Sequence, residues 1–414
     1  MKPAGVAPRF QSENRRNRFT ALANRGRGEK FGRHMSAPTL HTVHGQPSWA
    51  FRSSHVRAHL TRLGGHLGPV AFRLGAKTVA PFAVAPWAEE KLAPDTPALL
   101  RALRGDFFCA PFGGNARPWR GEKHPPHGEP ANAVWRLEAF ERAGERLTLH
   151  ARLSTRVRPG QVDKYITLID GQTAVYQRHV LTGRGPMNVG HHATLKFPDA
   201  PGSGVISTSR FVHAQVFPGA FELPENRGYQ SLQPGAKFRS LDRVPLLAGG
   251  TTDLSRYPAR QGFEDLAMLT ADEKLPFAWT AVTFPRERYV WFSLRDPRRL
   301  RHTVLWISNG GRHYPPWNGR HKAVMGLEDV TSYFHYGLAE SVGKNPLNRR
   351  GLATSLTLNP KRPTAFHYIM AVAAIPAGFD RVQEIREAKG GVELIAANGK
   401  RSRTDLDLGF LSGA

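Results

Sequence analysis

The chain has 414 residues, of which 40% are hydrophobic, and a formal net charge of +25. This length suffices for one large β domain or two ordinary domains, and the apolar content suffices for a substantial core. The longest apolar stretch, residues 368–379, contains a proline and is too short to cross a bilayer, so we expect no membrane partner. The single cysteine, Cys109, excludes an intrachain disulfide and indicates a reducing, cytoplasmic location.

Residues 1–34 carry nine Lys or Arg against two acidic residues and show almost no apolar periodicity, so we expect a disordered basic extension. Arg15-Arg16 is not followed by the apolar segment of an export signal, which argues against export. The remaining positive charge fits either a soluble surface or a field that attracts anionic ligands. The sequence has no helix-turn-helix spacing, zinc finger or RNP-like aromatic strand, so we expect no specific nucleic-acid binding.

From about residue 45 onward, apolar and polar residues alternate, which predicts an all-β fold. Residues 146–157 alternate along one strand, and residues 164–180 predict a hairpin because Asp170-Gly171 separates two β-prone runs. Frequent turns favour an antiparallel sandwich over a parallel sheet. Further strands are predicted at 205–217, 279–284, 289–294, 303–308, 365–374, 392–397 and 404–409.

Helices are expected to be few and short. They are predicted at 88–92, 97–103, 329–341 and 380–388, the last ending before Gly390-Gly391. The irregular run 220–275 is typical of a functional connection or a rim insertion. No linker divides the chain, so residues 35–414 are expected to form a single domain.

Three short segments place histidines and a glutamate at the edges of predicted strands. An imidazole and a carboxylate at one concave surface can move protons on and off a neutral substrate, so we expect chemistry that needs no cofactor and no metal. The segments are HPPHGEPAN (124–132), NVGHHATLKF (188–197) and GLEDVTSYF (326–334).

In their order along the chain and in their residues, these segments resemble the aldose 1-epimerase (galactose mutarotase-like) superfamily. The resemblance implies a large antiparallel β-supersandwich whose concave face binds a sugar. His127 falls at the family's His-Gly pair, with His124 as the alternative. His192 matches the second family histidine better than His191 does, and Glu328 matches the late Leu-Glu pair.

The segment PFGGNARPW supplies Asn115 and Arg117, which resemble an early Asn/Arg pair of the family. In the family the two are often adjacent, whereas here one residue separates them. The family's mid-chain acidic ligand has three candidates, Asp242, Asp253 and Asp265.

The resemblance implies interconversion of the anomers of a free or phosphorylated aldose, with Glu328 as the base and His192 as the acid. Substrate hydroxyls would be held by His127, His191, Asn115 and Arg117. Arg117 could instead bind the phosphate or carboxylate of an anionic sugar. The aromatic residues that could stack on a sugar face are Trp119, Trp135, Trp306 and Trp317.

Two other classes of protein fit the same residues. The first is a carbohydrate-binding protein that keeps the cleft but has no turnover. The second is a metal-dependent β-fold enzyme. Its candidate ligands are His124, His127, His191, His192 and Glu328.

Deletion of residues 1–34 should leave the melting temperature unchanged, because a segment without apolar periodicity contributes little to a core. Thermal unfolding of the full-length and truncated proteins checks this. A clear fall in melting temperature would show that the extension packs against the domain.

Overall fold

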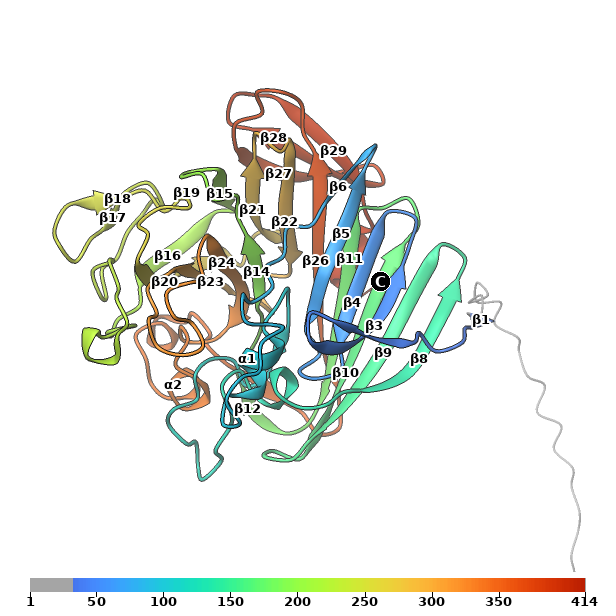
Figure 1. The fold of residues 1–414 in the computed structure, drawn as a ribbon, viewed down its shortest axis with the longest axis horizontal. Helices are drawn as coiled ribbons and strands as arrows, with labels where there is room; N and C mark the ends of the chain where they lie inside the picture. Colours follow the sequence, from blue (N-terminus) through green and yellow to red (C-terminus); the bar gives the residue numbers. More distant parts are fainter. Residues whose placement is uncertain (1–32, 414) are drawn as a thin grey trace, which may run out of the picture.

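The computed structural model describes residues 33–413, which fold almost entirely into antiparallel sheets and confirm the expected all-β fold (Figure 1). The basic extension predicted over residues 1–34 lies outside the described residues, except for its last two. These form β1 (Arg33–His34), which pairs with β8 (Arg136–Ala143), so regular structure begins just before residue 35. No helix among residues 33–413 is long and apolar enough to span a membrane.

The largest sheet has ten strands and forms one layer of the molecule. It includes the predicted hairpin, whose strands pair across Asp170-Gly171. In spatial order its strands are β1, β8, β9 (Arg146–Thr155), β10 (Gly160–Ile169), β11 (Ala174–Thr182), β26 (Thr364–Ala374), β22 (Tyr289–Arg295), β21 (Ala278–Phe284), β15 (Gly204–Thr208) and β19 (Arg256–Tyr257).

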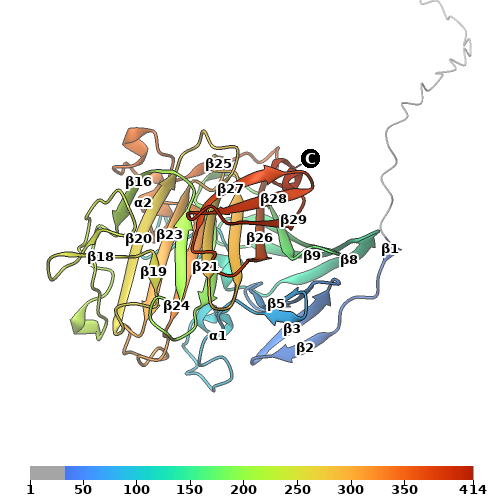
Figure 2. The ribbon, with the colours of Figure 1, turned by 90° about the horizontal axis from the view of Figure 1, so that it is seen from above.

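Two smaller sheets pack against one face of this layer and share a single hydrophobic core with it (Figure 2). The five-stranded sheet consists of β2 (Leu40–Val43), β3 (Gln46–Arg52), β4 (Val56–Thr61), β5 (Leu67–Leu74) and β6 (Lys77–Val79). The seven-stranded sheet consists of β16 (Phe211–Val216), β20 (Phe263–Ala271), β23 (His302–Asn309), β24 (Val324–Thr331), β13 (Val189–His191), β7 (Phe108–Cys109) and β14 (Ala193–Lys196), which pairs with β24.

The opposite face of the ten-stranded sheet is covered by the C-terminal part of the chain. A three-stranded sheet there encloses a second core around Trp279, Phe292 and Ile369 (Figure 2). Its strands are β27 (Val382–Ala388), β28 (Gly391–Ala396) and β29 (Arg401–Asp405). Two short pairs complete the sheets, β12 (Gly185–Met187) with β25 (Leu356–Leu358) and β17 (Val244–Pro245) with β18 (Thr251–Thr252).

Of the four predicted helices, only 97–103 is confirmed, as α1 (Ala98–Ala102). Residues 88–92 are not helical, and only residues 88 and 89 belong to a turn. The prediction over 329–341 is wrong at its start, because β24 continues through Thr331 and α2 begins only at Leu338 (Leu338–Val342). Four 3₁₀ turns occur at Glu129–Ala131, Pro224–Asn226, Asn348–Arg350 and Leu408–Ser412.

The helix predicted over 380–388 is also wrong, since Val382–Ala388 form β27. The register of β27 against β28 shifts between Val382 and Glu384, as at a β-bulge. The extra residue puts Val382 and Ile385, three positions apart, on the same buried side. An apolar spacing of three imitates the helical period, which explains the error.

The core contains many histidines that are held in the neutral form. Burial lowers the pKa of each of four of them to about 3: His66, His192, His302 and His321. In the unfolded chain the same imidazoles bind protons near pH 6.5. The unfolded state therefore takes up more protons than the folded state as the pH falls below 6.5.

We expect the free energy of unfolding to fall between pH 7 and pH 5, by about 2 kcal/mol for each such histidine. The raised pKa values of Glu264 and Glu328 act in the opposite sense, but the histidines outnumber these carboxyls. Urea unfolding at the two pH values checks the prediction. Equal or greater stability at pH 5 would contradict it.

Candidate active site

Glu328 lies in the middle of β24, a strand in which every residue is buried. Successive side chains of a strand point to opposite faces, so Glu328 and its neighbour Asp329 face different sides of the seven-stranded sheet. Asp329 faces the ten-stranded sheet, where Arg295 lies 2.8 Å from its carboxylate. Glu328 faces away from that core, toward a cavity that also contains His192.

The same alternation distinguishes the two adjacent histidines. His191, at the end of β13, is fully buried between the sheets, where its Nδ1 lies 2.9 Å from Asp106 and its ring stacks on Tyr368. His192 points to the other face and stacks on Phe107, with ring centroids 4.4 Å apart. The structure therefore brings His192, and not His191, into the cavity.

His192 and Glu328 form a close pair, with His192 Nε2 3.1 Å from Glu328 Oε1. Burial raises the pKa of Glu328 well above its usual value, and the charge of nearby Asp329 adds to the effect. Burial lowers the pKa of His192 to about 3. Near neutral pH the Glu328 carboxyl group is therefore protonated and His192 is neutral.

The hydrogen bond of His192 Nδ1 determines which ring nitrogen carries the proton. Thr194 donates its hydroxyl to the His192 carbonyl, so its oxygen is free to accept from Nδ1 at 3.1 Å. Nδ1 then carries the ring proton of neutral His192. Glu328 Oε2 has no hydrogen-bond partner among the described residues although it is buried. One carboxyl oxygen is therefore available for a ligand.

His127 enters the cavity from a loop in a strained conformation, with φ of 59°. The next residue, Gly128, has φ of 75°, and a Cβ there would lie 2.2 Å from the Ala110 carbonyl oxygen. A left-handed, non-glycine residue followed by an obligatory glycine costs energy and is maintained by surrounding contacts. The HG pair of the sequence is thus a backbone requirement as well as a motif.

Asn115 supplies those contacts. Its Nδ2 donates to the carbonyls of Pro111, Gly113 and Pro125. Its Oδ1 accepts from the Leu338 amide. Asn115 therefore ties the loop that carries His127 and does not itself line the cavity.

A third histidine completes the cluster. His335 Nε2 lies 3.1 Å from His127 Nε2, and the other nitrogen of His127 lies 3.4 Å from Cys109 Sγ. Burial lowers the pKa of His335 to about 4 and that of His127 well below its usual value, so both rings are neutral near pH 7. Burial raises the pKa of the Cys109 thiol, which keeps it in the protonated, unreactive form near pH 7.

The cavity has a volume of about 180 Å³. Its walls are mainly apolar and aromatic, and its polar lining residues are His127, His192, Arg312, Glu328 and His335. Two of the four tryptophans proposed to stack on a sugar, Trp306 and Trp317, line it. Trp135 is buried in the main core instead, and Trp119 packs between Arg120 and Arg158.

Arg312 is the cation of the cavity. Its guanidinium lies over the Trp317 ring, 4.7 Å from the ring centroid, and donates to Glu222 at 2.5 Å. Glu264 lies 3.7 Å from it and accepts from Trp306 Nε1 at 2.7 Å. Burial raises the pKa of Glu264 to about 7 against the opposing charge of Arg312.

Several predicted site residues lie elsewhere. Arg117 is 76% exposed and lies 3.5 Å from Glu340. His124 contacts Glu122 at 2.9 Å. Asp265, one of the three candidate acids, binds the backbone amides of Ser231 and Leu232. Neither Asp242 nor Asp253 lines the cavity.

Three functional candidates were missed in the sequence. Glu264 stands beside Asp265 on β20, and alternation turns it toward Trp306 and Arg312. Arg312 and His335 come from connections that lack a local pattern. His335 follows Glu328 by seven residues, and only the bend after β24 returns it to the site.

No group of three or more His, Cys, Asp or Glu within residues 33–413 is placed to hold a metal ion. His124 and His191 lie outside the cavity that holds His127, His192 and Glu328, so the five candidate ligands do not converge.

No family model and no curated protein matches the sequence. The fold, in contrast, matches solved structures. A candidate aldose 1-epimerase from Klebsiella pneumoniae is 13% identical with a TM-score of 0.58, covering 81% of this chain and 82% of that one. A candidate aldose 1-epimerase from Escherichia coli K12 is also 13% identical, with a TM-score of 0.53 and coverage of 80% and 100%.

A galactose mutarotase-like protein from Clostridium acetobutylicum is 11% identical with a TM-score of 0.52, covering 81% of this chain and 98% of that one. The chain therefore has the fold of the aldose 1-epimerase (galactose mutarotase-like) superfamily.

Gly326 leaves the space that the Glu328 carboxyl group occupies. A Cβ at this position would lie 2.6 Å from Glu328 Oε1 and 3.1 Å from Trp306 Cβ. We expect Gly326→Ala to displace the carboxyl group from His192 and to lower the free energy of unfolding by about 1–3 kcal/mol. Urea unfolding and the histidine ¹⁵N spectrum of His192 measure the two effects.

Gly183→Ala is the matched control, because a Cβ there meets only Leu358 Cδ1 at an ordinary 3.5 Å. If both variants shift the His192 signal equally, the proposed role of Gly326 is wrong.

Proposed function

We propose that this protein is an aldose 1-epimerase-like enzyme that interconverts the anomers of a free or phosphorylated sugar. The observation that carries the proposal is the His192–Glu328 pair, buried in an aromatic cavity with Nε2 and Oε1 3.1 Å apart. The superfamily fold supports it, since proteins with this fold include candidate aldose 1-epimerases. Trp306 and Trp317 offer apolar faces for a sugar ring.

The chemistry follows from moving one proton within the pair. Transfer from Glu328 to His192 yields a carboxylate and an imidazolium, the base and acid forms that ring opening needs. The carboxylate takes the O1 proton of the cyclic hemiacetal while the imidazolium protonates the ring oxygen, and the C1–O5 bond breaks. The aldehyde end rotates, and ring closure reverses both transfers.

His127 and His335 stand next to this pair in the neutral form, so each can accept or donate a hydrogen bond to a substrate hydroxyl. Arg312 is already neutralised by Glu222 and Glu264. It therefore serves as a hydrogen-bond donor and a wall of the site more than as a free positive charge.

A second candidate, a carbohydrate-binding protein without turnover, is favoured by three observations. His192 and Glu328 touch each other directly, and the cavity walls are mostly apolar. Arg117, which the resemblance assigned to the substrate, is exposed outside the cavity. Binding alone would not require proton transfer by His192 and Glu328, so measurement of turnover separates the two candidates.

Anomer exchange by NMR saturation transfer tests the proposal with glucose, galactose, uronic acids and hexose 6-phosphates. Wild type should accelerate exchange for at least one sugar. Glu328→Gln and His192→Ala should each reduce the rate by about 10²- to 10⁴-fold, the usual contribution of a positioned acid or base.

The exposed residues Glu384 and His41 provide matched controls as Glu384→Gln and His41→Ala, which should keep the wild-type rate. Sugar binding without accelerated exchange would support the binding protein. If none of these sugars shows either exchange or binding, both candidates are removed.

A further inference from the structure

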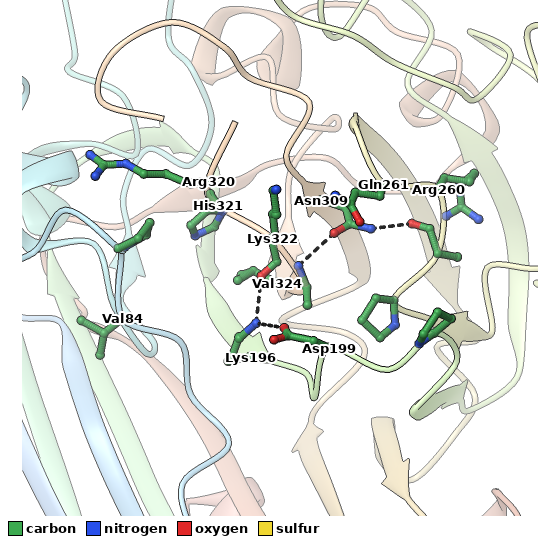
Figure 3. Close-up of a pocket in the computed structure, with 15 residues that line it drawn as sticks. Val84, Lys196, Asp199, Arg260, Gln261, Asn309, Arg320, His321, Lys322 and Val324 are labelled. Atoms are coloured by element: carbon green, nitrogen blue, oxygen red, sulfur yellow. Dashed lines mark hydrogen bonds and ion pairs between the residues drawn. The ribbon is translucent and has the colours of Figure 1, made fainter. Parts of the chain in front are cut away.

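A second, larger cavity opens at the start of β24, beside Val324. It has a volume of about 470 Å³ and is lined by the end of β14, the start of β24 and the connections before β20 and β24 (Figure 3). Val324 at its edge is four residues from Glu328, a distance of about 13 Å along the strand. His321 lines this cavity and stacks on Trp306, which lines the candidate active site, so the two rings form a wall between the sites.

The charged residues around this cavity are mostly cationic. Lys196, Arg260, Arg320 and Lys322 face a single carboxylate, Asp199. Lys196 binds Asp199 at 2.7 Å, and Arg320 binds Glu90 through two contacts. Within residues 33–413, the Lys322 ammonium group has no ion-pair partner, and it stands among the lining residues in Figure 3.

Arg260 adds a positive charge that its surroundings compensate incompletely. Its side chain is only 13% exposed, and its Nη1 donates to Thr252 at 2.8 Å. Its Nε and Nη2 atoms are buried without a hydrogen-bond partner in the described part of the chain. The nearest carboxylate, Asp265, is 4.0 Å away and already accepts from Ser231 and Leu232. These N–H groups are closed off from solvent, so Arg260 adds positive charge beside the cavity without a direct contact to a ligand.

His321 indicates that the ligand carries a hydrogen-bond donor. Ser308 donates its hydroxyl to Glu264 at 3.1 Å, so its oxygen accepts from His321 Nδ1 at 2.6 Å. His321 is only 3% exposed, and its Nε2 has no hydrogen bond to the described residues. A neutral Nε2 accepts a proton donor, while Lys322 attracts a negative charge. Hydrogen phosphate satisfies both, because it carries an O–H donor beside anionic oxygens, whereas a carboxylate only accepts.

We propose that this basic cavity binds a phosphate group at a site separate from the candidate active site. The phosphate group can come from inorganic phosphate or from a phosphate ester, and the experiment distinguishes these sources. Lys322 supplies the direct attraction, Arg260 adds positive charge at the far side of the cavity, and His321 accepts the phosphate O–H. This inference does not depend on the proposed epimerase activity.

Isothermal titration of the full-length protein at pH 7 and low salt, with inorganic phosphate and with glucose 6-phosphate, tests the proposal. Saturable binding of inorganic phosphate should weaken by about tenfold in Lys322→Glu, which replaces an attraction by a repulsion. Tighter binding of glucose 6-phosphate, with the same loss, would identify an ester as the better ligand.

Lys389→Glu is the matched control, since Lys389 is an exposed lysine in the turn between β27 and β28 and the change in net charge is identical. Equal loss in both variants would show that only the overall charge matters, and absence of saturable binding would overturn the site directly. Phosphate should also shift the ¹⁵N signals of His321, assigned with His321→Gln. This second measurement tests the proposal even if Lys322→Glu folds poorly. If phosphate does not shift the ¹⁵N signals of His321, the proposal is overturned.

A further variant distinguishes phosphate binding in the two cavities. Glu328→Gln should bind inorganic phosphate as tightly as wild type, because Glu328 lies on the other side of the Trp306–His321 wall. Weaker phosphate binding in Glu328→Gln would place the anion in the candidate active site and overturn the separate site, whatever the result for anomer exchange.

Discussion

The ion pair between Asp329 and Arg295 determines how the two main sheets are joined and, through this, where the candidate active site can form. Asp329 belongs to the seven-stranded sheet and Arg295 to the ten-stranded sheet, and both are almost completely buried. Hydroxyl groups from β22, β23 and β26 saturate the carboxylate: Ser293 at 2.6 Å, Thr303 at 2.8 Å and Tyr368 at 2.9 Å. A one-residue slip of β24 would break all of these contacts and place Glu328 in the core instead.

Two neighbouring carboxyl groups on one strand thus have opposite environments. Asp329 has all its hydrogen-bonding capacity used and holds the sheets in register. Glu328 has one neutral histidine partner and one unpartnered oxygen. Different surroundings of this kind are how one fold assigns a structural role to one carboxyl group and acid/base chemistry to another.

The sequence pattern was sufficient for most of the fold where strands alternate regularly, as in β9 and the β10–β11 hairpin. It failed in β27, where the backbone departs from that period and the bulge produced an apparent helix. It also failed in β20, a strand that contains acidic and polar residues and lies within the run judged irregular from the sequence. In the site, His127, His192 and Glu328 were found because each lies in a short motif. Glu264, Arg312 and His335 were not, because long-range packing brings them to the cavity and no local spacing records it.

The order of strands in the ten-stranded sheet has a consequence for how the protein is made. β26 lies between β11 and β22 at the centre of the sheet, although it is the last of the ten strands in the chain (Figure 1). During synthesis, the strands up to β11 and those from β15 to β22 must wait as two separate groups, each with an unpaired edge. Only when residues 364–374 leave the ribosome can the central strand join them, and β27–β29 then cover its outer face. A chain that stops before β26 would keep Glu328 and His192 and still lack the central strand of the sheet against which their own sheet packs.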